Sequence, residues 1–216
     1  MDTDKPSLRH QHSDLTRDLI LRTVAAMLEE GAPSELVVPE VARRASVSLR
    51  TVYRHFPSRD ELIAAAGEWI GVNILAAGMP ETLDDIPTEY ARNAPRLDEH
   101  PKLVYAMAFS RGANSLRSVR RQRRLENLRK ALREVTDGLS EAEARRAFAV
   151  FAYLDNMLAW VTMRDEAGLN GEEVGAAVAW AMNVLIEDLR RRQRAAGDSP
   201  HSDDRRTVGV KNKRSR

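Results

Sequence analysis

Several features on which other protein classes depend are scarce or missing in this sequence. The 216 residues include no cysteine, which excludes disulfide scaffolds, thiolate metal sites, cysteine nucleophiles and thiol redox sensors. Aromatic residues make up only 5% of the chain, and there are 11 glycines and 9 prolines. Strand-rich proteins usually carry more aromatic and β-branched residues and more turns. These shortages favour an all-α protein.

Long apolar runs and a strong net charge are missing as well. The longest largely apolar stretch, Ala147–Met163, is shorter than the ~20 residues that span a bilayer, and Met1–Asp14 does not resemble a signal peptide. We therefore expect a cytoplasmic protein with no membrane partner. The 34 basic and 32 acidic residues leave a formal charge of +2, but a sum over the whole chain can hide a local basic surface.

Helical patterns with clear start and stop signals (helix punctuation) are present instead. Capping boxes begin at Ser58 and Ser140, and Gly31, Gly138 and Gly168 suit helix stops. We predict about nine helices and no strand. The first begins near Leu15. Residues 82–97 should form only short helices because they contain two prolines, and 140–167 and 170–196 should form two long antiparallel helices.

The most informative stretch is Val38–Phe56, where two short helices flank a tight break at Ser46–Ser48. Small apolar residues would let the two helices cross closely. The outward positions of the second helix carry hydroxyl, aromatic and basic side chains, which suit phosphates and base edges. An ordinary helical hairpin with an exposed arginine face is the alternative. The candidate DNA contacts are Arg44, Ser48, Leu49, Arg50, Thr51, Tyr53, Arg54, His55 and Arg59.

The block from Val41 to Leu62 resembles the tetracycline-repressor (TetR) family. The resemblance lies in Thr-Val-Tyr-Arg-His-Phe at 51–56, followed by a short turn, a basic residue and an acidic helix start, and it covers about residues 16–66. Two positions depart from the family. Val37 stands where a capping Thr or Ser is usual, so Ser34 or Glu35 would have to cap, and Ser46 stands where Gly is usual, at a mild cost if the backbone there has positive φ.

The resemblance implies a homodimer that reads a palindromic operator on double-stranded DNA and represses transcription until a small-molecule ligand binds. It implies a helix-turn-helix DNA-binding domain (14–59) and a ligand-binding and dimerisation domain (60–196). The polar composition of the two ends predicts a disordered N-terminal arm (1–13) and a flexible basic tail (197–216). Arg17 and Arg22 of the first helix could touch the same DNA backbone. The alternative function is a helical ligand carrier or interaction protein whose helix-turn-helix is non-functional.

Two candidate sites fall in the second domain. One side of the final helix would form a dimer interface, or else pack inside one subunit: Val174, Val178, Ala181, Met182, Leu185 and Leu189. A mainly apolar pocket would draw on Trp69, Tyr105, Met107, Phe109, Phe151, Asp155, Asn156 and Trp160. Asp155 and Asn156, in an apolar helix, either bind ligand or pair structurally.

Two further patterns have less specific readings. The cluster formed by Arg117, Arg120, Arg121, Arg123, Arg124, Arg129, Lys130 and Arg133 could be a second nucleic-acid surface, but a solvated helix face is the more common explanation. The five histidines show no metal-ligand spacing on an ordered helix, and no phosphate loop or nucleophile elbow is present. We therefore expect no enzyme activity, no metal and no cofactor.

Overall fold

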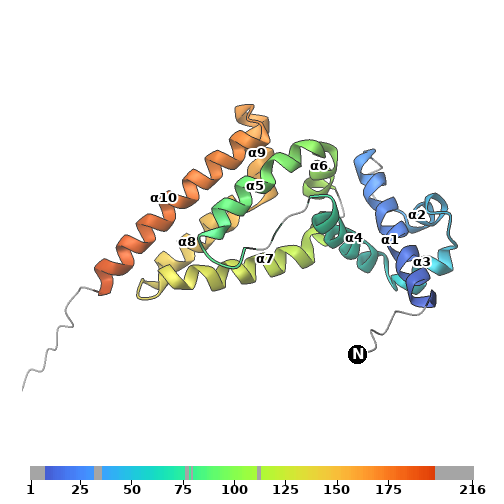
Figure 1. Ribbon diagram of the computed structural model, residues 1–216, viewed down its shortest axis with the longest axis horizontal. Helices are drawn as coiled ribbons and strands as arrows, with labels where there is room; N and C mark the ends of the chain where they lie inside the picture. The colour runs from blue at the N-terminus through green and yellow to red at the C-terminus, as the bar shows by residue number, and fades with distance from the viewer. Residues whose placement is uncertain (1–7, 32–35, 76–77, 79, 111–112, 198–216) are drawn as a thin grey trace, which may run out of the picture.

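The computed structural model describes residues 8–31, 36–75, 78, 80–110 and 113–197. Within these ranges the chain forms ten α-helices and no strand, which confirms the all-α prediction (Figure 1). The helices are α1 (Leu8–Glu29), α2 (Val38–Arg44), α3 (Leu49–His55), α4 (Arg59–Asn73), α5 (Asp85–Glu99), α6 (Pro101–Phe109), α7 (Ala113–Thr136), α8 (Glu141–Leu154), α9 (Met157–Ala167) and α10 (Gly171–Gly197). No helix of the described residues is long and apolar enough to cross a membrane.

The predicted helix stops and the capping box at Ser140 are confirmed, whereas at Ser58 half of the predicted box is present: the Ser58 Oγ accepts from the Glu61 N–H at 3.1 Å. Ser140 and Glu143 complete both halves of a capping box at the start of α8. Gly31, Gly138 and Gly168 have φ values of 76°, 84° and 69° where α1, α7 and α9 stop. Glycine reaches this left-handed region without the steric penalty that a Cβ brings.

Two predicted boundaries are wrong. Residues 8–13, expected in a disordered arm, belong to α1, which begins at Leu8; residues 1–7 and the tail from 198 lie outside the described residues. Residues 85–99 form one helix instead of short pieces. Pro87 lies in the first turn of α5, where its missing N–H costs little, and packing of α5 against α10 outweighs the hydrogen bond lost at Pro95.

The long helix expected over 140–167 is also a wrong prediction, because it breaks at Asp155 and Asn156. Asn156 is extended, and its side chain accepts a hydrogen bond from the Leu158 N–H at 3.1 Å, which caps α9. Arg124 of α7 donates to the carbonyl oxygens of Ala152, at 3.3 Å, and Asp155. It thereby satisfies carbonyls that the end of α8 leaves without a helical partner.

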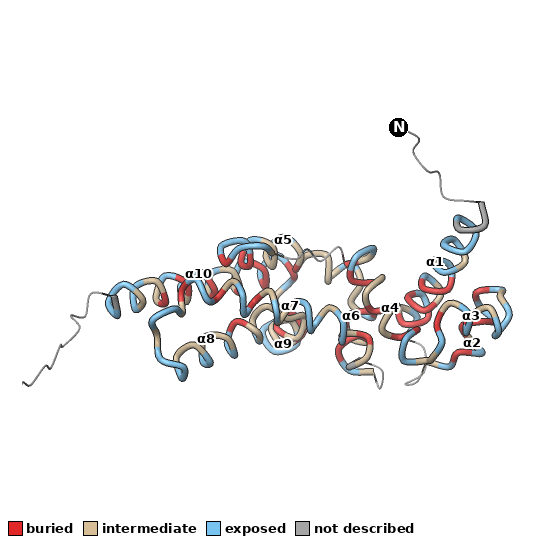
Figure 2. The backbone as a smooth tube through the Cα atoms, turned by 90° about the horizontal axis from the view of Figure 1, so that it is seen from below, coloured by how far each residue is buried: buried red, intermediate tan, exposed pale blue. Residues whose placement is uncertain are grey.

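The first four helices form a compact unit at one end of an elongated molecule (Figures 1 and 2). Ile20 and Val24 of α1, Val41 of α2 and Val52 of α3 are fully buried there. Figure 2 shows buried residues along α1 to α4 where these helices meet. α4 leaves this unit and packs against α7, so it belongs to both halves of the molecule.

The crossing of α4 and α7 requires glycine. A Cβ at Gly67 would lie 1.6 Å from the backbone oxygen of Leu116, and one at Gly71 would lie 2.4 Å from the Cδ of Arg120. No side chain fits at the first position unless the helices separate. Helix α4 is therefore held against α7 by backbone contact, next to the arginines of that helix.

The apolar stripe of α10 is covered within the single chain. A dimer interface, which was its expected role, would need the stripe to be exposed. Val174, Val178 and Met182 are completely buried and Leu189 is 8% exposed within the single chain, while Ala181 and Leu185 are partly covered. α10 packs mainly on α5. The packing inside one subunit, which was the alternative, is what the structure has.

Candidate functional site

The turn between α2 and α3 fixes the start of α3. Ser48 is the N-cap: its Oγ accepts from the Thr51 N–H at 3.0 Å and lies 2.8 Å from the Thr51 Oγ1. Ser46 has φ 54°, the only positive φ among the described non-glycine residues. The mild cost expected of serine in place of the family's usual glycine is therefore present.

The outward face of α3 is polar, basic and open to solvent. Val52 is buried against the other helices and anchors α3, so Arg50, Tyr53 and Arg54 project away from the protein. Tyr53 is 44% exposed and Leu49 42%. No carboxylate lies on α3. This face can therefore approach a polyanion without repulsion from its own helix.

The two flanking arginines are held by the protein itself. Arg44 forms ion pairs with Glu30 and Glu40. Arg43 also bonds Glu40, and the two arginines lower the pKa of Glu40 to about 2. Arg59 donates from Nε to the Leu36 carbonyl at 2.8 Å. Binding DNA through these groups would require rearrangement of existing contacts, unlike binding through Arg50 or Arg54.

His55 points partly inward. Its Nε2 is buried, and the described residues offer it no hydrogen-bond partner. Burial, with help from Arg54 and Arg17, lowers the pKa of His55, so the ring is neutral near pH 7. Arg17 of α1 also lies 5.2 Å from the ring centroid of Phe56. His55 thus serves the packing of α3 more than its outward face.

The start of α2 lacks the usual side-chain cap. Val37 occupies the N-cap position, is 49% exposed and forms no capping hydrogen bond. The alternative caps suggested from the sequence, Ser34 and Glu35, lie outside the described residues. Pro39 in the first turn limits the loss because it removes one N–H that would need a partner.

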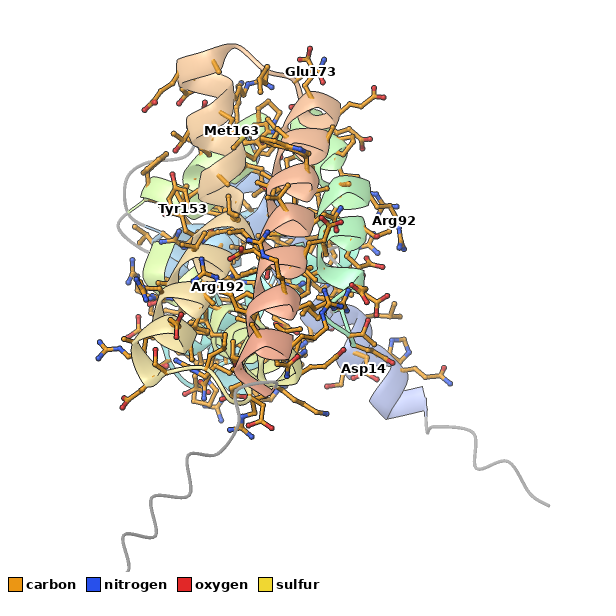
Figure 3. All side chains as sticks on the ribbon, turned by 90° about the vertical axis from the view of Figure 1, so that its left-hand side faces the viewer. Asp14, Arg92, Tyr153, Met163, Glu173 and Arg192 are labelled. Atoms are coloured by element: carbon orange, nitrogen blue, oxygen red, sulfur yellow. The ribbon has the colours of Figure 1, made fainter. Side chains whose placement is uncertain are left out.

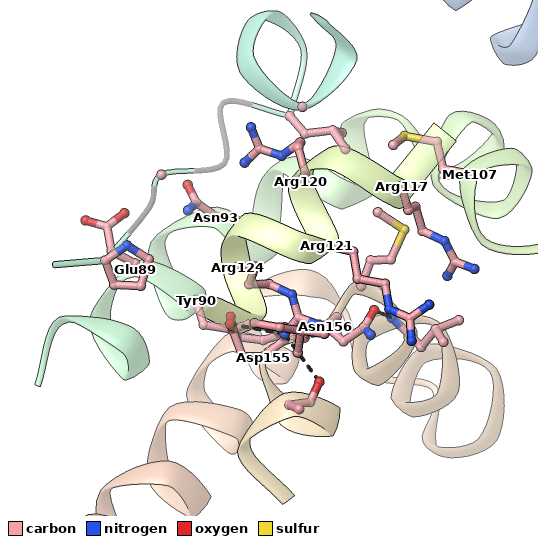
Figure 4. A pocket seen from close by; sticks show the side chains of 18 of the residues that line it. Glu89, Tyr90, Asn93, Met107, Arg117, Arg120, Arg121, Arg124, Asp155 and Asn156 are labelled. Carbon is pink, nitrogen blue, oxygen red and sulfur yellow. Dashed lines mark hydrogen bonds and ion pairs between the residues drawn. The ribbon is translucent and has the colours of Figure 1, made fainter. Parts of the chain in front are cut away.

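A cavity of about 630 Å³ lies in the second half of the molecule, between α4, α5, α7 and the α8–α9 break (Figure 4). Its size is that of a pocket for a drug-sized molecule. It is lined by Gly71, Leu75, Gly78, Pro80, Glu89, Tyr90, Asn93, Ala94, Leu97, Met107, Leu116, Arg117, Arg120, Arg121, Arg124, Leu125, Arg129, Phe148, Ala152, Asp155, Asn156, Met157 and Leu158.

Three of the eight residues predicted to form a pocket line this cavity: Met107, Asp155 and Asn156. The other five do not line the cavity and make contacts elsewhere. Phe151 and Trp160 are fully buried in the core, and the Nε1–H of Trp160 donates to Asp98 at 3.1 Å. Phe109 is 64% exposed. Trp69 donates to Asp18 of α1, and Tyr105 donates to Asp165.

The largest difference from the sequence-based expectation is the arginine content of the cavity. The charged stretch of α7 was interpreted as a solvated face, yet five of its arginines line the cavity: Arg117, Arg120, Arg121, Arg124 and Arg129. Figure 4 shows four of them on one helix, together with Asp155 and Asn156 at the break. The cavity therefore combines apolar walls with a group of arginines that the sequence reading had not placed there.

The spacing of α7 contained a signal for this arrangement. Leu132 and Leu128 belong to the buried stripe of the helix, and four-residue steps back from them reach Arg124 and Arg120. Arginines thus continue an inward-facing stripe. Tyr90 and Asn93 of α5 were also missed, because α5 was expected to be broken. Burial raises the pKa of Tyr90, whose hydroxyl donates to the Asn156 carbonyl at 3.3 Å.

Comparisons with known proteins agree with this architecture. Residues 20–66 match the family model described as bacterial regulatory proteins, tetR family. A search of curated proteins by sequence found no match.

Three solved structures of similar fold are informative. A tetR-family transcriptional regulator from Streptomyces coelicolor is 18% identical, with a TM-score of 0.58 over 85% of this chain and 90% of that one. NalD from Pseudomonas aeruginosa, the secondary repressor of the MexAB-OprM multidrug efflux pump, is 16% identical, with a TM-score of 0.56 over 81% and 96%. A transcriptional regulator from Rhodococcus sp. Rha1 is 21% identical, with a TM-score of 0.52 over 80% and 96%.

The family match falls on the four-helix unit that presents α3, and the structural likeness extends over both halves of the chain. Residues 20–66 therefore belong to the tetR family of bacterial regulatory proteins, and the chain as a whole has the fold of solved regulators of that kind.

Proposed function

We propose that this DNA-binding regulator is a repressor that occupies a palindromic operator as a homodimer and releases it when a small molecule enters the cavity. The observation that carries the proposal is the course of α4. The helix begins at Arg59, shortly after α3; its other end contributes Gly71 to the cavity wall, and Leu75, just beyond that end, lines the cavity as well. A change in the cavity therefore acts on a rod that is attached to the DNA-facing helix.

The DNA contacts would come from the outward face of α3. Arg50 and Arg54 are exposed and their helix carries no acid. Guanidinium groups bind phosphates or guanine edges, while Tyr53 and the hydroxyls of Ser48 and Thr51 suit phosphate oxygens. We assign Arg44, His55 and Arg59 a secondary part, because each already serves the packing of the domain.

The dimer interface would use the outer faces of α8 and α10, in place of the stripe that proved to be buried. Trp180 is 71% exposed and Val184 49% on α10, and Tyr153 is 53% exposed and Val150 44% on α8. The two helices contact each other, and Tyr153 of α8 is labelled in Figure 3. Large apolar side chains gathered on one face commonly mark an interface, and a two-fold dimer would bring four helices together.

The reading of α3 is tested with Arg54→Ala and duplex DNA from the promoter region next to the gene. We expect affinity to fall about tenfold and the salt dependence to lose roughly one counterion, because one phosphate contact is removed. Fluorescence anisotropy over a range of salt concentrations measures both. Arg133→Ala, an exposed arginine of α7 away from α3 and the cavity, is the matched control. Equal binding by the two variants would contradict the assigned role.

The dimer face is tested with Trp180→Glu. A carboxylate buried in an apolar interface costs several kcal/mol, so we expect the variant to be monomeric by light scattering at concentrations where the unaltered chain is dimeric. Phe109→Glu serves as the control, since Phe109 is similarly exposed, at 64%, but lies on α6. A dimer that survives the Trp180 change as readily as the Phe109 change would overturn this interface.

A further inference from the structure

We propose that the molecule taken up by the cavity is an amphipathic organic anion, with an acidic head group on an apolar body of drug-like size. This inference rests on the proposed function, because it treats the cavity as the effector site. It goes further by naming the chemical class of the effector. Three independent properties of the cavity wall support it: its charge, the contacts already made by its charged groups, and its apolar surface.

The charge of the wall is strongly positive. Five arginines of α7 line the cavity, against two carboxylates, Glu89 and Asp155. A chain with almost equal numbers of acidic and basic residues has thus gathered an excess of three positive charges around one hollow. A bound anion would offset this excess, whereas a bound cation would add to it.

One of the two carboxylates already forms an ion pair with an arginine of the wall. Asp155 is paired with Arg124, whose Nη1 lies 3.3 Å from its Oδ2, and the Arg124 guanidinium also bonds two backbone carbonyls at the α8–α9 break. Arg129 lies over the Phe148 ring at 4.5 Å from its centroid. These two arginines hold the wall together. Arg117, Arg120 and Arg121 form a second cationic group of the wall, which also contains Glu89, and Glu68 of α4 lies near enough to Arg120 to act on its pKa.

The environment of this cationic group favours the uptake of an anion. Arg117 and Arg120 are only partly exposed. Burial lowers the pKa of both, and Arg121 lowers that of Arg117 further. A partly desolvated guanidinium gains more from a charge-assisted hydrogen bond than one in water does, and its planar fork matches a carboxylate or phosphate group.

The rest of the wall is apolar and would hold the body of the ligand. Leu97 of α5, Met107 of α6 and Leu125 of α7 line the cavity, together with Leu75, which follows the end of α4. An inorganic anion would leave this surface and most of the volume unfilled. An apolar body attached to the anion would remove this surface from water, which favours binding in proportion to the apolar area buried. The combination selects an amphiphile.

The experiment uses three probes with the same ten-carbon chain: decanoate, 1-decanol and decyltrimethylammonium. Each is titrated into the full-length protein by calorimetry, below the concentration at which it forms micelles. We expect decanoate to bind at least tenfold more tightly than the alcohol, and the ammonium compound to bind most weakly. Equal or tighter binding of the neutral or cationic probe would overturn the inference, as would the absence of binding by all three.

Variants show whether the arginines are responsible. Arg120→Gln and Arg121→Gln should each weaken decanoate binding about tenfold and leave decanol binding unchanged, whereas Arg133→Gln, on the same helix outside the cavity, should change neither. Arg121 is exposed, so its variant keeps the test valid if the Arg120 variant does not fold. A loss of decanoate and decanol binding in equal measure would contradict the assignment of the head group to these arginines.

Two further arms separate head groups and separate this inference from the proposed function. Decyl phosphate is compared with decanoate, and the tighter of the two identifies the acidic group; either preference supports an anion site. Release from DNA is measured separately, by anisotropy with saturating decanoate. An anion that binds through Arg121 without weakening DNA binding would support the ligand class and count against the repressor mechanism. A protein that binds decanoate through Arg121 but binds no DNA would likewise support the ligand class and count against the repressor mechanism.

Discussion

Two helices of this protein present arginines, and their surroundings give them different partners. On α3 the basic side chains are exposed on a helix that carries no acid, where they can meet an extended polyanion. On α7 they line a hollow that also has leucine and methionine walls. The same guanidinium group is therefore suited to DNA backbone in one region and to a small amphipathic anion in the other.

The comparison also shows how the two regions are joined. α4 is shared by both and touches α7 through the backbone at Gly67. Arg120 of α7 lies next to Gly71 of α4. One of the arginines of the cavity therefore contacts the helix that leads to α3. The two regions differ in how far their arginines are exposed to solvent, and they are connected where α4 crosses α7.

The largest expected effect comes from breaking that crossing with Gly67→Ala. The added Cβ would overlap the Leu116 carbonyl, so the helices must separate, and we expect a loss of about 3 kcal/mol in the free energy of unfolding. Urea unfolding measures it. Gly78→Ala is the control, because the added Cβ meets only the ends of the Glu89 and Asn93 side chains and no backbone atom. A variant as stable as the control would show that the two regions are not coupled by close contact.

A smaller effect, within the DNA-facing region, is expected from Ser46→Gly. Glycine removes the strain of positive φ but adds freedom to the unfolded chain, so we expect a net gain of about 0.5 kcal/mol. Ser48→Ala, two residues on, should act in the opposite direction by about 1 kcal/mol because it removes the cap of α3. If the urea midpoints of both variants shifted in the same direction from that of the unaltered protein, the result would contradict strain at Ser46.

The smallest effect, within the cavity region, is a change in pH dependence. Burial raises the pKa of Asp155 above its usual 3.8, although Arg124 opposes the change. The folded state therefore holds this proton more tightly, and the stabilisation present below 3.8 is lost as pH rises through the higher value. Relative to Asp155→Asn, the unaltered protein should lose stability as the pH rises toward neutrality, as measured by urea unfolding at several pH values.

A contrasting variant at the start of α8 sharpens this result. Hydrogen bonds from Ser140 lower the pKa of Glu143, so its contribution is present above 4.5 and is lost as pH falls through the lower value. The unaltered protein should therefore lose stability relative to Glu143→Gln as the solution becomes more acidic. Identical pH trends for Asp155→Asn and Glu143→Gln would show that burial does not control Asp155.

Local features were well predicted from the sequence. The caps at Ser58, Ser140 and Gly168 depend on a few neighbouring residues, and they appear where expected. The outward positions of α3 follow from the period of one short helix. Errors arose where distant segments meet: the α8–α9 break depends on Arg124 across the cavity, and the continuity of α5 depends on α10.

The sequence by itself determined the all-α class, the helix punctuation and the basic, acid-free face of α3, because each depends on interactions between residues close along the chain. Only the tertiary structure decided which face of a longer helix is inside. The stripe of α10 was assigned to a dimer face but is buried within the chain, and five arginines of α7 were assigned to solvent but line a cavity, since periodicity defines a face but not the partner that covers it. Packing of helices far apart in the sequence buried the apolar stripe and turned the arginines toward a cavity.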